Sequence, residues 1–147
     1  MKTLDEIPPT WSQTLSPASE RFELVLNEEA VLDKETGLVW DREGSADTKS
    51  WLGADLYCST LVIGNRMGWR LPTREELTSL IDPLQEEPAL SPGYAAFFDN
   101  MTASSRYWSS TAYPDSPFAY AAHLYYNIVK TEFKTAGIYV RAVRGGQ

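Results

Sequence analysis

The stretch Gly68-Trp69-Arg70-Leu71-Pro72-Thr73-Arg74-Glu75-Glu76-Leu77 constrains the fold more than any other part of the chain. Thr73 and Glu76 match a capping box, in which each side chain accepts a hydrogen bond from the other residue's backbone N–H. The pattern therefore predicts a helix that begins at Thr73. Pro72 fixes the entry to this helix, and Asp82-Pro83 ends it.

The residues before the cap are predicted to contribute to the hydrophobic core and its contacts. We expect Trp69 to be buried and Arg70 to reach backbone carbonyls or a carboxylate. Upstream, a helix is predicted from Ser50 to Leu61, because apolar side chains recur there at helical spacing. Cys58 belongs to this apolar stripe and is expected in the core, since a free cysteine behaves as a small hydrophobic residue. Gly64 is expected to cap the helix.

Strand-forming runs lie on both sides of the helices. Residues 21–26 and 30–33 predict strands, and the second is joined to Leu38-Val39-Trp40 by a loop in which Gly37 supplies a left-handed residue. After a long loop from Leu84 to Ser105, further runs predict an antiparallel meander of four strands. These runs are 107–113, 119–126, 128–133 and 138–143. The expected fold class is α+β, with two helices packed against twisted antiparallel sheets.

The bulk properties fit one domain, over residues 21–147, preceded by an irregular arm at 1–20 that contains Trp11. The net charge of −7 argues against nucleic acid as a partner, because such binding depends on Lys and Arg. No apolar run at the N-terminus is long enough for a signal peptide or a membrane span, which favours the cytoplasm. Removal of a leader would instead place the protein on the cell surface or outside the cell.

The same residues, in the same order, resemble a known family. They are Val31-Leu32-Asp33, Thr36-Gly37-Leu38-Val39-Trp40, Trp51 with Ala54 and Tyr57-Cys58, Gly68 to Thr73 with Glu76-Leu77, Tyr107-Trp108-Ser109-Ser110-Thr111, and Val140 to Gly145. This series is similar to the C-terminal domain family of the Legionella collagen-like protein, a bacterial domain of unknown function. The resemblance covers about residues 31–145 and implies a fold related to C-type lectins and formylglycine-generating enzymes.

The resemblance carries over no metal, cofactor or catalytic residue. Calcium-dependent lectins of this superfamily use Glu-Pro-Asn and Trp-Asn-Asp motifs, and this sequence has neither. The related enzymes need a cysteine pair, whereas this chain has only Cys58. The founding protein resembles an adhesin that binds sulfated polysaccharides and trimerises. The resemblance therefore implies an adhesin-like binding module more than an enzyme.

Nine residues of the series are assigned a structural role. They are Trp40, Trp51, Cys58, Trp69, Arg70, Pro72, Trp108, Arg141 and Arg144. Arg141 and Arg144 are expected to hold the last strand to acidic partners near the hairpin, for instance Asp33 or Asp41. An exposed arginine beside aromatic rings would instead contact an anion.

A tyrosine-rich segment near the end of the chain is the predicted ligand site. Tyrosine offers a flat apolar face and a polar tip at small entropic cost, and prolines stiffen the intervening loop. The candidate ligand-binding residues are Tyr113, Asp115, Tyr120, His123, Tyr125 and Tyr126. The alternative is that most of these rings cover the sheet. On this reading the chain is a non-catalytic module that recognises a glycan or a protein surface.

Two other functions stay open from the sequence. A serine hydrolase would use Ser110 with His123 and Asp115, although the spacing of a nucleophile elbow is missing. The chain would otherwise be a structural subunit of a homo-oligomer, such as a trimer, with Trp11 and the arm at the interface.

Overall fold

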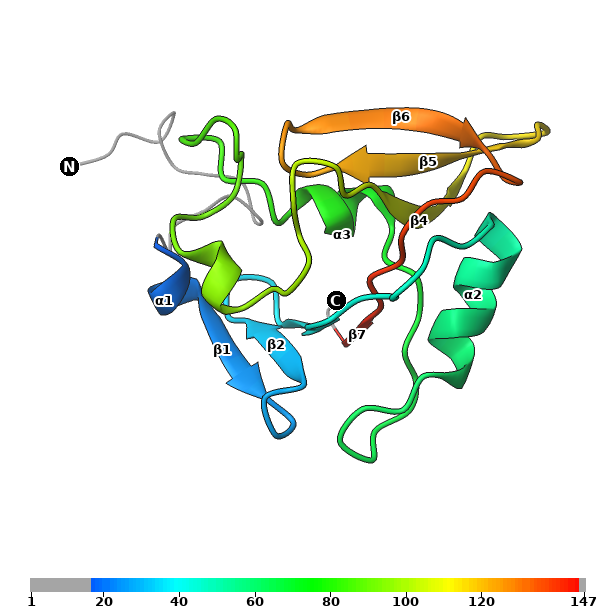
Figure 1. Cartoon of the computed structure of the whole chain (residues 1–147). Helices are drawn as coiled ribbons and strands as arrows, with labels where there is room; N and C mark the ends of the chain where they lie inside the picture. The colour runs from blue at the N-terminus through cyan, green and yellow to red at the C-terminus, as the bar shows by residue number, and fades with distance from the viewer. Residues whose placement is uncertain (1–16, 146–147) are drawn as a thin grey trace.

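Two antiparallel sheets form the frame of the domain in the computed structural model, which describes residues 17–145 (Figure 1). The first sheet has the order β1 (Phe22–Val25), β2 (Ala30–Asp33), β3 (Leu38–Asp41), β7 (Val143–Gly145). The second has the order β4 (Tyr107–Ala112), β5 (Phe118–His123), β6 (Ile128–Phe133). The helices are α1 (Ala18–Arg21), α2 (Trp51–Thr60), α3 (Arg74–Thr78) and the 3-10 turn η2 (Tyr94–Ala96).

The predicted hairpin is confirmed. β2 and β3 pair antiparallel with Val31 opposite Trp40, and Gly37 in the turn has a φ of +79°. β7 then adds to the free edge of β3, with Val143 opposite Trp40. The first sheet therefore combines three strands from the N-terminal part of the described chain with β7 from its C-terminal part.

Both predicted helices are present, but the second is shorter than predicted: α3 (Arg74–Thr78) ends before Ser79, and Ile81 bridges to Leu90, so Asp82-Pro83 does not end the helix. Thr73 and Glu76 make the reciprocal bonds of the capping box, and α3 follows directly. Ser50 caps α2 by accepting from the N–H of Gly53 at 3.1 Å. The prediction that Gly64 caps α2 is wrong: the helix ends at Thr60, Leu61 is extended, and Gly64 lies beyond it in a separate turn that the bonds between Ile63 and Arg66 close.

The predicted four-stranded meander is wrong in its last member. β4, β5 and β6 form a three-stranded meander, but residues 138–142 do not pair with β6. This extended segment runs between the two sheets and bridges to Lys49, Tyr107 and, through Val143, Arg70. Alternating side chains predicted an extended backbone correctly, but alternation does not specify which strand lies beside it.

The beginning of the described chain is helical rather than irregular. Residues 18–20 of the predicted arm form α1 with Arg21, and Ala18 is fully buried. Trp11 lies outside the described residues. Within residues 17–145 every helix is too short or too polar to span a lipid bilayer.

Two groups of buried side chains hold the layers together. One contains Trp40, Leu77 and Phe98, and the other contains Cys58, Trp69 and Trp108. In Figure 1, α3 lies beneath the three-stranded sheet, where it packs on β4 and β5, and α2 lies to one side. The long loop brings residues 99–105 near the segment 138–142, where Arg141 donates to the carbonyl of Asp99.

Candidate functional site

The residues assigned a structural role lie mainly in the interior. Trp40, Trp69, Trp108 and Cys58 are at most 3% exposed. Burial, followed by the nearby charges of Asp41 and Asp55, raises the pKa of the Cys58 thiol to about 12. Pro72 is also buried, and its carbonyl accepts from the N–H of Ser110 at 2.7 Å.

The remaining signature side chains join separate parts of the fold. Arg70 binds both carboxylate oxygens of Glu76 at 2.7 and 2.8 Å, as its predicted role required. Burial alone would raise the pKa of Glu76, but hydrogen bonds from Arg70 and Thr73 lower it. Trp51 is half-buried and donates its indole N–H to the carbonyl of Ser109 at 2.9 Å. Arg144 lies over the Trp69 ring at 5.9 Å.

Arg141 does not bind a carboxylate, which corrects its predicted pairing with Asp33 or Asp41. The carboxylate of Asp33 is instead held by Arg21, at 2.7 and 2.9 Å, and both side chains are fully buried. Arg21 also donates to the carbonyl of Ser79 at 2.7 Å. Sequence reasoning missed this pair, because Arg21 stands at the edge of the predicted arm among exposed polar residues.

The predicted ligand-binding residues fall into two groups at opposite ends of β5. At one end, the Tyr113 and Tyr120 rings are 6.2 Å apart, and the Arg74 guanidinium lies 4.4 Å from the Tyr120 ring. Asp115 is exposed in the β4–β5 turn. At the other end, the Tyr126 ring lies 4.9 Å from the His123 ring.

Tyr125 completes this second group, with its ring also 4.9 Å from that of Tyr126. Tyr113 is 49% and Tyr126 39% exposed, whereas Tyr120, His123 and Tyr125 are half-buried. The residues of the two groups therefore offer two surfaces rather than one.

The three residues of the alternative serine hydrolase are not brought together. Asp115 precedes β5 and His123 ends it, and a six-residue strand is roughly 17 Å long. The Nε2 atom of His123 contacts the carbonyl oxygen of Ala103. Ser110 lies on β4, where its N–H is bonded to Pro72. The predicted grouping therefore gives no nucleophile with a neighbouring base.

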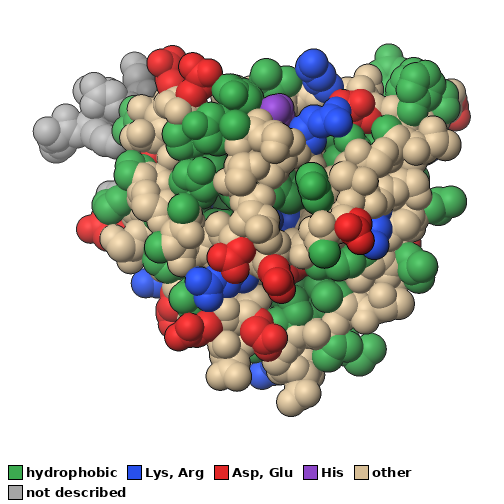
Figure 2. Space-filling model, viewed as in Figure 1, with side chains coloured by type: hydrophobic (Ala, Val, Ile, Leu, Met, Phe, Trp, Pro, Cys, Tyr) green, Lys and Arg blue, Asp and Glu red, His purple; other side chains and the backbone are tan. Residues whose placement is uncertain are grey.

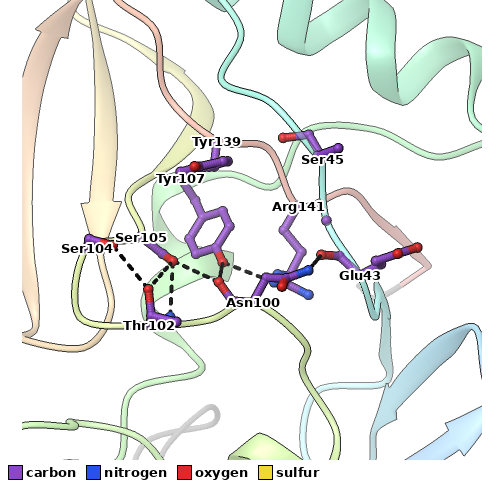
Figure 3. Close-up of a pocket in the computed structure, with 11 residues that line it drawn as sticks. Glu43, Ser45, Asn100, Thr102, Ser104, Ser105, Tyr107, Tyr139 and Arg141 are labelled. Carbon is purple, nitrogen blue, oxygen red and sulfur yellow. Dashed lines mark hydrogen bonds between the residues drawn. The ribbon is translucent and has the colours of Figure 1, made fainter.

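A polar cavity of about 410 Å³ opens beside the segment 138–142 (Figure 3). We call it the loop cavity. Its walls come from three places: the connection after β3, the end of the long loop with the first residue of β4, and the segment 138–142. The lining residues are Glu43, Gly44, Ser45, Ala46, Asn100, Thr102, Ser104, Ser105, Tyr107, Tyr139 and Arg141.

The first wall is shaped by the side chain of Asp41. One carboxylate oxygen accepts from the N–H groups of Glu43 and Gly44 at 3.2 and 3.1 Å, which is how aspartate typically builds a turn. The other oxygen accepts from the Tyr57 hydroxyl at 2.7 Å. Burial, followed by the charge of Asp41, raises the pKa of Tyr57, so this hydroxyl stays a donor. Gly44 has a φ of +77° and allows close approach of Arg141.

The second wall is a hydroxyl-rich turn. Ser105 donates to the Asn100 carbonyl at 2.8 Å and accepts from the Thr102 N–H at 3.0 Å. The Thr102 hydroxyl lies 3.2 Å from that of Ser104. Of the predicted site residues, His123 contacts this turn, through the carbonyl oxygen of Ala103.

Arg141 ties the walls together. Its guanidinium donates to the carbonyls of Asp41, Arg42 and Asp99, and to the Tyr107 hydroxyl at 3.0 Å. Its side chain is 1% exposed, and among residues 17–145 no carboxylate lies within ion-pair distance of it. Arg141 therefore joins the connection after β3 to the long loop through hydrogen bonds to backbone carbonyls of both.

The chemistry of the loop cavity suits recognition by hydrogen bonding. Serine, threonine, asparagine and tyrosine dominate its lining, and this composition is typical of binding surfaces that adapt to polar ligands. In the described part of the chain, no cluster of His, Cys, Asp and Glu is arranged to hold a metal ion. Local patterns do not predict this site, because residues 43–46, 100–105 and 139–141 converge only in the folded chain.

Comparison with known proteins identifies the class. The family model of the Lcl C-terminal domain matches residues 29–144. The chain belongs to this family, as the ordered motifs predicted. No curated protein matched the sequence.

Proposed function

We propose that the chain is a non-catalytic binding module with a C-type-lectin-like fold, and that it recognises a glycan in the loop cavity. One observation carries the proposal: hydroxyl, amide and tyrosine side chains line a cavity whose walls Arg141 holds in place. Sugars are bound through many hydroxyl groups, each of which needs a donor or an acceptor in the site.

The size and shape of the site support the same function. A volume of about 410 Å³ lies within the range of roughly 300–1,000 Å³ that small-ligand sites occupy. The half-buried Tyr139 ring adds an apolar surface to the polar walls. A site that is already formed loses little conformational entropy on binding, which favours affinity.

A protein surface is the competing ligand, and the two tyrosine groups on β5 are the competing site. Exposed tyrosines are typical of protein-binding surfaces, and Tyr113 and Tyr126 are both exposed. These rings lie at opposite ends of a strand, however, whereas the loop cavity gathers its polar groups around one space.

A glycan array followed by calorimetry with the best ligand tests the proposal. Ser104→Trp places a large ring where Ser104 lines the cavity, and we expect it to abolish binding. Ser59→Trp is the matched control, since Ser59 is exposed at the end of α2 and outside the cavity lining. The loop cavity is not the glycan site if both variants bind with equal affinity, or if only Tyr120→Ala/Tyr125→Ala loses binding. An array without any ligand would also contradict the proposal.

A further inference from the structure

β6 is the outer strand of its sheet, and its far side is open. The strand order leaves β6 paired only with β5, and Figure 1 shows it along the upper margin of the domain. The opposite edge of the sheet is covered, because the backbone N–H of Trp108 in β4 donates to the carbonyl of Tyr139 at 3.0 Å. Apart from Glu132, every residue of β6 is exposed, including Phe133 at 57%.

The backbone of β6 presents polar groups to its open side, and of these the carbonyl of Phe133 already accepts from the N–H of Ala136 at 2.8 Å. The N–H of Lys134 donates to the carbonyl of Pro117, and the register continues without a bulge to Ile128 opposite His123. Because alternate residues of an antiparallel strand bond to the same neighbour, Val129, Thr131 and Phe133 direct their N–H and C=O groups away from β5. These three outward residues are centred on Thr131.

From this pattern we infer that β6 pairs antiparallel with β6 of a second copy of the chain, about a two-fold axis at Thr131. This axis places Thr131 opposite its own counterpart and Val129 opposite Phe133. The two Thr131 residues then exchange both of their N–H···O=C bonds, and the Phe133 carbonyl accepts the N–H of Val129 of the other copy with its second lone pair. The result is one continuous six-stranded sheet across an interface that uses the same surface on both copies.

The side chains of β6 are complementary to themselves in this register. Lys130 of each copy lies opposite Glu132 of the other, so the axis creates two pairs of opposite charge. Within residues 17–145 Lys130 has no ion pair, whereas Glu132 binds Arg106 at 2.8 Å. Figure 2 shows basic side chains with an acidic neighbour along the upper margin, over the three-stranded sheet.

A second copy suits this edge better than an unrelated strand. Edge strands are normally protected from pairing by a proline, a bulge or an unmatched lysine. β6 has neither a proline nor a bulge. Its one lysine, Lys130, is two residues from Glu132, and a two-fold axis at Thr131 places each of them opposite the other across the interface.

Sedimentation equilibrium of the full chain, from micromolar concentrations to about 1 mM, tests the inference. We expect a concentration-dependent dimer. Lys130→Glu and Glu132→Lys each turn both cross-strand pairs into like charges, and each should weaken dimerisation by roughly 30-fold. An equimolar mixture of the two variants restores both opposite-charge pairs and should form a heterodimer.

The outcomes separate this interface from other forms of association. Thr131→Pro removes an outward N–H without removing a bond to β5, so it should give a folded monomer; circular dichroism checks the fold. A wild-type chain that stays monomeric throughout would overturn the inference. So would an oligomer that Lys130→Glu leaves unchanged, or variants that fail to rescue each other. Ser104→Trp changes the loop cavity and leaves β6 intact, so this variant should dimerise normally. The dimerisation test and the glycan-binding test can therefore fail independently of each other.

Discussion

Replacing Arg141 by methionine tests the part that this side chain plays in building the loop cavity. The substitution removes the donors to three carbonyls and to the Tyr107 hydroxyl, while it keeps most of the side-chain volume. Asp99 is exposed and Arg42 half-buried, so water can replace the bonds to their carbonyls. The buried acceptors of Asp41 and Tyr107 lose bonds to a charged donor, each worth about 1.5–3 kcal/mol.

The expected net loss in the free energy of unfolding is about 3 kcal/mol, because removing an unpaired buried charge offsets part of the cost. Urea denaturation measures it. Arg106→Met is the matched control: its ion pair with Glu132 is solvent-exposed on the arginine side, and such a pair contributes at most about 1 kcal/mol. Equal losses in the two variants would refute the role given to Arg141.

Three further predictions concern groups around the site. Cys58 should resist iodoacetamide at pH 8 in the folded protein and react once urea unfolds it; the folded pKa of about 12 lies above the usual 9.0, so its contribution to stability is lost as the pH rises from 9 towards 12. Rapid labelling of the native chain would contradict this burial. Glu76→Gln should destabilise the protein at pH 7, and the difference from wild type should shrink below about pH 4.5, because the folded pKa of Glu76 is lowered and its stabilisation is lost on protonation. Denaturation curves that stay equally separated at all pH values would be inconsistent with the Arg70–Glu76 pair. Gly44→Ala should cost about 1–2 kcal/mol in thermal denaturation, since its φ is +77° and the new Cβ would lie 3.2 Å from the Arg141 guanidinium; an unchanged melting temperature would argue against the tight wall.

Local signals in the sequence predicted the elements well. The capping box at Thr73 and the turn at Gly37 depend on residues within a few positions of one another, and both are present. The ordered motifs also predicted the family, which the match over residues 29–144 confirms.

Contacts between distant parts of the chain could not be predicted in this way. The segment 138–142 has the alternation of a strand, but it bridges to Lys49 and Tyr107, which no local pattern specifies. The partner of Arg141 was predicted as a carboxylate by charge alone. In the folded chain Arg141 donates to backbone carbonyls instead, while Asp33 binds Arg21 and the Asp41 carboxylate accepts from the Tyr57 hydroxyl.

A chemical-shift map of the isotopically labelled protein, titrated with the best glycan from the array, tests the central claim most directly. Binding in the loop cavity predicts that the largest amide shifts gather at residues 43–46, 100–105 and 139–141. Shifts confined to Tyr113, Tyr120 and Tyr125, or spread evenly over the chain, would contradict it.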